Sequence, residues 1–150
     1  MATSYDEVAA LIRNSPAASF GTPDTGATDE WIAKAEARLG VSFPPSYKWW
    51  LKNYGGGEIG GEEILSIYGI DFDEAVGGDI VFQNTHRKLP PNCLLISDTG
   101  ADEEFYFDTG KPDQDGEYPI MSFEHPDRET PYASNFLEFL QKRLEFFSRG

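Results

Sequence analysis

The spacing of apolar residues changes twice along this chain of 150 residues, and this constrains the fold more than any other sequence feature. Up to residue 54, apolar side chains recur three and four positions apart, which predicts amphipathic helices. From residue 64 to residue 123 they form short runs of β-branched, aliphatic and aromatic residues, which favour strands. After residue 134 the helical spacing returns. Because helices and strands occupy separate stretches, we expect an α+β fold rather than alternating βαβ units.

Capping residues bound the first expected helix. Ser4 with Glu7 three positions later forms a capping-box pattern and predicts a helix over about residues 5–13. The following residues, 14–27, include several Pro and Gly residues and are expected to form a loop.

Two further helices are predicted before the glycine-rich segment that follows residue 54. Thr28, followed by two acidic residues, has the pattern of a helix N-cap, and Gly40 ends that helix. Pro44 and Pro45 mark the first turn of the next helix, because proline is tolerated there but not in a helix interior. Consecutive glycines starting at Gly55 end it.

Four runs are expected to be strands: residues 64–68, 93–96, 105–107 and 119–123. Residues 107–110, Phe-Asp-Thr-Gly, have turn chemistry between two of these runs, so at least part of the sheet is expected to be antiparallel. Residues 80–88 fit a helix or a strand, and the sequence does not decide between them. A last helix, opening at Ser134, has a wide apolar stripe that must cover other structure.

These features predict one domain over residues 1–150, with a mainly antiparallel sheet flanked by N-terminal helices and a C-terminal helix. The chain is long enough to bury a core without a disulfide or a metal. Its single cysteine, Cys93, allows no intramolecular disulfide, which is typical of a reducing compartment. No signal peptide or membrane span is expected, since the first twenty residues hold no long apolar run, and we place the chain in the cytoplasm.

Acidic residues outnumber basic ones by 26 to 12, for a formal net charge of -14. Phosphate backbones and anionic lipid surfaces would be repelled, so neither nucleic acid nor membrane is an expected partner. A basic protein would instead be attracted over a long range. The acids concentrate in the expected strands and their loops. Residues 58–79 hold seven acids and no Lys or Arg, and residues 98–129 hold eleven acids against Lys111 and Arg128.

Two motifs with known chemistry are matched only formally. Residues 55–60 fit GxGxxG, but a dinucleotide site requires this motif between a strand and a helix, whereas here it follows a helix and opens a strand. Residues 113–116 fit the middle of a calcium loop, but Lys111 and Ser122 stand where further carboxylate ligands belong. We therefore expect a helix end and a turn at these places, and no metal or cofactor site.

Catalysis is not expected either. A nucleophilic enzyme needs Ser, Cys or Thr beside a histidine with an orienting acid, but Cys93 lies in an apolar run where a small buried residue is usual. His86 and His125, the two histidines of the sequence, belong to no zinc-binding motif. A small enzyme that uses either histidine with nearby carboxylates stays an alternative, as does a carboxylate pair of the glycosidase type.

A pattern of spaced residues runs through the second and third expected helices. An acid and Leu-Gly close one helix, a Pro precedes the next, and Tyr-Lys, Leu, Asn and Gly follow. These residues are Glu36, Leu39, Gly40, Pro44, Tyr47, Lys48, Leu51, Asn53 and Gly55. In this pattern the segment from Trp31 to Gly56 resembles the SUKH superfamily, specifically its SMI/KNR-type branch. Residues 132–140 are also similar to the last helix of that family.

The resemblance implies an α+β binding module without catalytic residues, in which the residues of the pattern are structural. Bacterial members are similar to immunity proteins that neutralise polymorphic toxins, often nucleases, by binding them, whereas eukaryotic members resemble regulatory adaptors. It therefore implies a cognate toxin domain as protein partner, bound through the variable strands and loops. A non-catalytic scaffold or regulatory adaptor is the alternative.

We expect an acidic sheet face with aromatic anchors to cover the toxin's functional site. The predicted steering or contact residues are Glu62, Asp71, Asp73, Asp98, Asp102, Glu103 and Glu104. Aromatic residues interleaved with them, Tyr68 and Tyr106 among others, are candidate anchors, although most at alternate strand positions should lie in the core. The same acids also fit a hydrated surface that only keeps the protein in solution.

Overall fold

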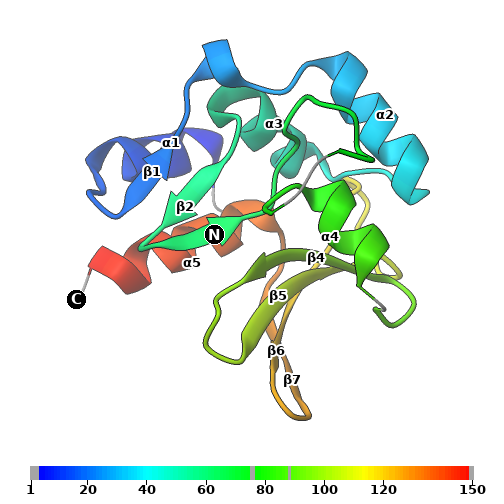
Figure 1. Ribbon diagram of the computed structural model, residues 1–150. Coiled ribbons are helices and arrows are strands. Elements are labelled where there is room, and N and C mark those ends of the chain that lie inside the picture. The colour runs from blue at the N-terminus through cyan, green and yellow to red at the C-terminus, as the bar shows by residue number, and fades with distance from the viewer. Residues whose placement is uncertain (1–3, 75–76, 88, 149–150) are drawn as a thin grey trace.

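The computed structural model describes residues 4–74, 77–87 and 89–148 of the chain. Its helices are α1 (Tyr5–Asn14), the short 3-10 helix η1 (Pro23–Thr25), α2 (Asp29–Leu39), α3 (Pro45–Tyr54), α4 (Ile80–His86) and α5 (Phe136–Ser148). Its strands are β1 (Ala18–Phe20), β2 (Gly57–Ile59), β3 (Glu62–Ile64), β4 (Cys93–Asp98), β5 (Glu103–Asp108), β6 (Ile120–Glu124) and β7 (Arg128–Ala133). Figure 1 shows their arrangement.

The strands form one sheet in the order β1-β2-β3-β4-β5-β6-β7, and each pairs antiparallel with the next along the chain. The sheet is therefore a meander. Its two parts meet at the pairing of Ile64 in β3 with Ser97 in β4, and β4 to β7 form the longer part (Figure 1). The α+β class and the antiparallel sheet expected from the sequence are confirmed.

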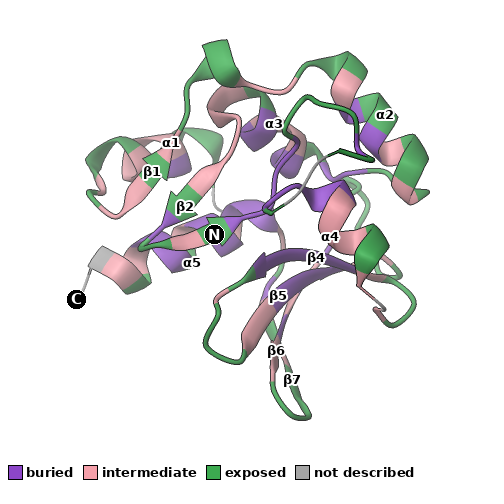
Figure 2. Ribbon diagram, in the orientation of Figure 1, coloured by how far each residue is buried: buried purple, intermediate pink, exposed green. Residues whose placement is uncertain are grey.

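Helix α5 crosses the sheet and contacts β2, β7, α1 and α3. We call the side of β4 to β7 that it covers the inner face. The centre of the core is a cluster of aromatic rings between α3, α5 and β5. Tyr47 and Trp50 of α3 pack against Phe136 of α5 with ring centroids 5.1 and 5.6 Å apart, and Tyr47 packs against Phe107 of β5 at 5.7 Å. All four side chains are fully buried, and Figure 2 shows burial concentrated on these elements. Burying such a side chain contributes roughly 1.5–3 kcal/mol, so the cluster fixes α3 and α5 on the sheet.

Helix α4 lies beside β4, at the edge that the short strand β3 leaves largely unpaired. The Asn84 side chain accepts a hydrogen bond from the Leu95 backbone N–H at 2.8 Å and donates one to the Leu95 carbonyl at 3.0 Å. It thus replaces a neighbouring strand at this position. Residues 80–88, which the sequence left undecided, are helical from Ile80 to His86, and Lys88 lies outside the described residues.

The helix ends predicted at Ser4, Gly40 and Gly55 are confirmed, whereas the last helix, expected to open at Ser134, begins at Phe136. The Ser4 side chain accepts a hydrogen bond from the Glu7 backbone N–H at 3.2 Å. Gly40 and Gly55 end α2 and α3 in the left-handed region, each with φ +71°. At Gly55 a Cβ atom would lie 2.4 Å from the Thr25 carbonyl oxygen, so this turn requires glycine.

Some expected boundaries are wrong. Residues 14–27, expected to be a loop, contain β1 and η1, and β2 and β7 were not predicted. Strands β1 and β2 have three residues each, too few to show an alternating pattern. Strand β7 lies at the edge of the sheet and contains Pro131. Proline is unusual in a strand, because it cannot donate a backbone hydrogen bond, but it is tolerated at a sheet edge. The strand expected over residues 64–68 is wrong except at its first residue: β3 runs from Glu62 to Ile64, and in the rest of that range only Ser66 forms an isolated bridge, to Asp79.

Candidate functional site

Strand β5 divides its side chains between the two faces of the sheet. Phe105 and Phe107 point to the inner face, where both are fully buried. Glu104 and Tyr106 alternate with them and point to the opposite side, which we call the outer face. By the strand register the outer face also includes Cys93, Leu95, Asp98, Asp108, Met121, Phe123, Glu129 and Pro131.

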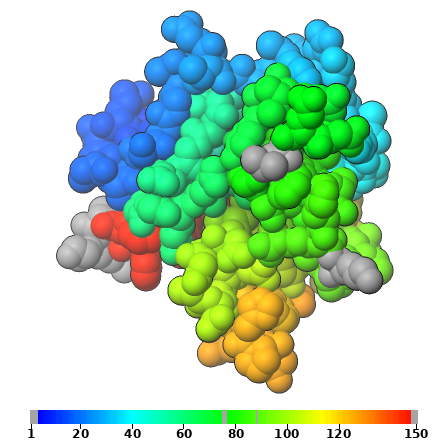
Figure 3. Space-filling view, viewed as in Figure 1, coloured from blue at the N-terminus to red at the C-terminus, as the bar shows by residue number. Residues whose placement is uncertain are grey.

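The outer face is only partly covered. The segment that follows α4 lies over its β4 side, while Cys93, Met121 and Phe123 stay half-buried and His125 is exposed. Figure 3 shows the tips of the β4–β5 and β6–β7 hairpins side by side, projecting from the body of the molecule. The backbone N–H of His125 donates to the Asp102 carbonyl at 2.8 Å and ties the two tips together.

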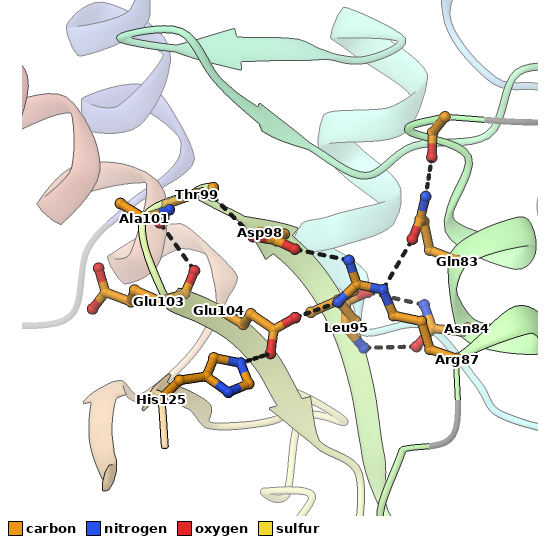
Figure 4. A network of polar contacts seen from close by, with 12 residues as sticks. Gln83, Asn84, Arg87, Leu95, Asp98, Thr99, Ala101, Glu103, Glu104 and His125 are labelled. Atoms are coloured by element: carbon orange, nitrogen blue, oxygen red, sulfur yellow. Dashed lines mark hydrogen bonds and ion pairs between the residues drawn. The ribbon is translucent and has the colours of Figure 1, made fainter. Parts of the chain in front are cut away.

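Arg87, just after α4, reaches over the outer face and joins two strands. Its guanidinium donates to Asp98 Oδ2 at 2.7 Å and to Glu104 Oε2, and its Nε donates to Gln83 Oε1 at 3.1 Å (Figure 4). The bond to Asp98, and then that to Glu104, raises the pKa of the guanidinium, although burial opposes this. Burial would raise the pKa of Asp98, but hydrogen bonds from Arg87 and from the Gly100 N–H outweigh it and hold that pKa below its ordinary value.

Glu104 is the hub of this network. Its side chain is 15% exposed, and Oε1 lies 2.9 Å from Nε2 of His125 while Oε2 accepts from Arg87. The His125 ring in turn packs edge-on against Phe123, with ring centroids 4.9 Å apart. A single carboxylate thus positions one cation and one imidazole over the outer face (Figure 4).

Beside the network lies a pocket of about 330 Å³. Its lining residues come from the segment after α4, from the four strands of the outer face and from the β6–β7 turn: Arg87, Leu89, Pro90, Cys93, Leu95, Glu104, Tyr106, Phe123, His125 and Glu129. Burial and the neighbouring Glu129 carboxylate raise the pKa of the Tyr106 hydroxyl, and burial, Glu129 and Asp108 raise that of the Cys93 thiol. Most of the lining side chains are apolar or aromatic, and two carboxylates, Glu104 and Glu129, and one guanidinium, that of Arg87, lie among them.

Three of the predicted contact residues meet on this surface. Asp98 and Glu104 are held together by Arg87, and Asp102 lies exposed at the tip of the β4–β5 hairpin. Asp102 adopts φ 66°, a left-handed conformation that Asp tolerates better than most residues.

Glu62 and Glu103 are engaged elsewhere. Glu62 pairs with Arg143 of α5, which is 7% exposed and lies over the Phe105 ring on the inner face. Glu103 accepts a hydrogen bond from the buried Ser122 hydroxyl at 2.7 Å. These two carboxylates are part of the contacts that hold the sheet and α5 together.

Asp71 and Asp73 belong to a third place, the loop between β3 and α4. Asp73 pairs with Arg38 of α2 at 2.6 Å, and its backbone N–H donates to Asp71 Oδ1 at 2.9 Å. Figure 1 shows this loop beside α2, on the other side of α4 from the β6–β7 hairpin. The seven predicted residues therefore do not form one face.

Two further acids of the same sequence segments are buried and structural. Asp79 accepts hydrogen bonds from the backbone N–H groups of Val81 and Phe82 at 2.9 and 3.0 Å and so caps α4. Glu117 accepts from the backbone N–H and the hydroxyl of Ser46 at 2.9 and 2.6 Å and binds the first turn of α3. The count of acids in the sequence thus overestimates the exposed negative charge.

Of the residues that line the pocket, only Glu104 was a predicted contact; the charged and aromatic ones that were not predicted are Arg87, Tyr106, Phe123, His125 and Glu129. Tyr106 was considered as an anchor, and its alternation with Phe105 and Phe107 was the signal that places it opposite the core. Arg87 had no such signal, because its partners lie 11 and 17 positions away.

The residues considered for catalysis are placed as follows. Cys93 was expected to be buried, but at the start of β4 it is only half-buried, and its raised pKa favours the unreactive thiol. His86 packs against the Phe82 ring with centroids 4.3 Å apart.

Residues 113–116, which fit the middle of a calcium loop, form a turn closed by a 3.1 Å hydrogen bond from the Gly116 N–H to the Asp113 carbonyl. Within the described residues, no group of three His, Cys, Asp or Glu side chains is placed to hold a metal ion.

The residues of the sequence pattern in α2 and α3 hold these helices together. Glu36 accepts a 2.7 Å hydrogen bond from the Phe43 N–H and pairs with Lys48 at 3.3 Å. The buried Tyr47 hydroxyl donates to the Leu65 carbonyl at 2.6 Å. Pro44 is the N-cap of α3, and the Asn53 side chain donates a hydrogen bond to the Trp49 carbonyl. Leu51 is buried, and Leu39 packs against the core.

Residues 26–142 match the model of the SMI1 / KNR4 family (SUKH-1). The match spans α2, α3, α4, all strands from β2 to β7 and the first half of α5. In the part of the chain that the structure describes, no helix is long and apolar enough to cross a membrane.

Proposed function

This chain belongs to the SMI1 / KNR4 family (SUKH-1), and from that membership we propose that it is an immunity protein, which binds a cognate toxin domain and neutralises it by covering the toxin's functional site. The SUKH family is associated with immunity proteins in toxin systems. We propose further that the protein acts in the cytoplasm, without catalysis, and in a stoichiometric complex.

The observation that carries this proposal is the outer face of β4 to β7. Its strands leave apolar side chains, among them Tyr106 and Phe123, beside a pocket, with the carboxylates of Asp98, Glu104 and Glu129 around them. A partly buried aromatic centre with a charged border is the usual composition of a protein-binding surface. The border is acidic, which favours a basic surface on the partner.

Long-range electrostatics also favours a basic partner. The net charge of -14 attracts a positively charged domain and raises its association rate at low salt. Once the partner is bound, the apolar centre of the interface determines how slowly it leaves.

The direct test is co-expression with the C-terminal domain of the large secreted protein encoded beside this chain. We expect a stoichiometric complex in which the toxin activity is silenced and whose association is slower at high salt. A chain that forms no complex, or one that binds while the toxin stays fully active, would contradict the proposal. A stable complex with a partner that has no toxin activity would instead support the alternative, a non-catalytic scaffold or regulatory adaptor.

A further inference from the structure

A row of three side chains crosses the pocket of the outer face. The strand register pairs Glu104 of β5 with Phe123 of β6, and Phe123 with Glu129 of β7. An aromatic ring is therefore flanked by carboxylates on both neighbouring strands, which lie roughly two strand spacings, about 10 Å, apart. Tyr106 lines the same pocket. The volume of the pocket, about 330 Å³, is at the lower end of the range of small-molecule sites. The pocket therefore fits a single side chain better than a large ligand.

The two carboxylates differ in what they already bind. Glu104 accepts from Arg87 and lies against His125, so its charge is compensated within the protein. Glu129 is exposed and hydrogen-bonds with the Tyr106 hydroxyl, but within the described residues it takes part in no ion pair. It contributes to the raised pKa of both Tyr106 and Cys93 on the pocket wall. The site thus has a carboxylate without an ion-pair partner beside the rings of Phe123 and Tyr106.

A guanidinium group suits this arrangement. It is planar and weakly hydrated, stacks on aromatic rings and forms paired hydrogen bonds with a carboxylate. The protein's own Arg87 forms such contacts beside the pocket, because its guanidinium bridges the carboxylates of Asp98 and Glu104.

We propose that the pocket receives one arginine side chain of the protein partner, with its stem on Phe123 and Tyr106 and its guanidinium on Glu129. This inference rests on the proposed function for the identity of the partner, but the pocket's preference for a guanidinium can be measured without it. Arginine is enriched among the residues that dominate binding energy at protein interfaces.

The first experiment uses N-acetyl-L-arginine amide as the probe and N-acetyl-L-citrulline amide as its uncharged counterpart. In an NMR titration of the full chain we expect the arginine amide to shift the ring signals of Phe123 and Tyr106 in a saturable way, with a dissociation constant of about 1–10 mM. The citrulline amide should produce at most a tenth of that affinity. Equal binding of the two amides, or no saturable shift with either, would overturn the inference.

The second experiment compares Glu129→Gln with Asp127→Asn, which removes the same charge at the exposed β6–β7 turn outside the pocket lining. Glu129→Gln should weaken binding of the arginine amide and of the toxin domain about tenfold or more, mainly through faster dissociation of the toxin domain. Asp127→Asn should change both by less than about threefold.

The outcomes separate the two proposals. If the toxin domain binds the wild type and Glu129→Gln equally, the pocket inference fails while the immunity proposal stands. If the arginine amide binds through Glu129 but no toxin domain is bound, the immunity proposal fails and the pocket remains a guanidinium site.

Discussion

The inner and outer faces of β4 to β7 are built on the same strands but satisfy their polar groups in different ways. On the inner side, 9% of the Arg143 side chain is exposed, and it pairs with Glu62 and lies over the rings of Phe105, Phe146 and Phe147. On the outer side, Arg87 bridges Asp98 and Glu104 with 35% of its side chain exposed. An ion pair with a nearly buried guanidinium holds the fold together, whereas a network with a more exposed guanidinium can exchange partners.

This difference suggests that the inner face stabilises the fold and that the outer face binds the partner. The inner face carries the aromatic cluster of Tyr47, Trp50, Phe107 and Phe136, whose contacts depend on close packing. The outer face carries side chains that α5 does not cover and that can change with little effect on that packing. We therefore expect substitutions on the inner face to alter stability and substitutions on the outer face to alter binding.

The largest expected effect is the loss of a ring from the inner cluster. Phe136→Ala removes a fully buried side chain that touches Tyr47, Trp50 and Phe107, and should lower the free energy of unfolding by about 3–5 kcal/mol in urea titrations. Phe146→Ala in the same helix is the control, because Phe146 is 61% exposed, and it should cost less than about 1 kcal/mol. Similar losses for both variants would show that the aromatic cluster is not the centre of the core.

A pair of identical substitutions compares a buried carboxylate with an outer-face carboxylate. Glu117→Gln weakens the two hydrogen bonds from Ser46 at the start of α3 and should lower the free energy of unfolding by about 1.5–3 kcal/mol. Glu129→Gln should change it by less than about 0.5 kcal/mol, since Glu129 is exposed on an edge strand. Thermal and urea unfolding of the two variants measure this difference. Equal stability of both variants would mean that Glu117 does not hold α3.

The smallest expected effect concerns the outer network and its dependence on pH. The folded-state pKa of Asp98 is lowered from the ordinary 3.8, so its contribution to stability is present above that value and is lost as the pH falls through the folded pKa. Because the pair is solvent-accessible, Asp98→Asn should cost less than about 1 kcal/mol at pH 7, and the difference from the wild type should shrink toward zero in acid. Urea titrations between pH 7 and pH 2 measure it. A difference that grows in acid would contradict the assigned role of Arg87.

Much of the fold follows from local sequence signals. The capping residues and glycines at the ends of α1 to α3 act within a few positions, and the apolar runs of β4, β5 and β6 show directly in the chain. Strand β1 was missed because it is short and its partner β2 lies far along the chain, β2 because it has only three residues, and β7 because it contains Pro131. Helix α4 was undecided because seven residues are too few to establish a helical period.

The candidate site was harder to predict because its charges are arranged by the fold. The sequence shows how many acids a segment holds but not which of them are compensated. Arg143 is 81 positions from Glu62, and Arg38 is 35 positions from Asp73. Of the seven predicted contact residues, the structure places Asp98, Asp102 and Glu104 on one surface, and whether they touch a partner stays a prediction.

The most direct test of the account is the affinity for the toxin domain of two variants with the same change in charge. One variant combines Asp98→Asn, Asp102→Asn and Glu129→Gln on the outer face. The other combines Asp6→Asn, Asp24→Asn and Asp115→Asn, at exposed positions of α1, η1 and the β5–β6 connection. We predict that the outer-face variant binds about 10–100-fold more weakly at low salt while it stays folded and loses less than about 2 kcal/mol of unfolding free energy, and that the control binds less than about threefold more weakly. Equal weakening of both variants would show that net charge alone attracts the partner, and it would contradict a binding site on the outer face.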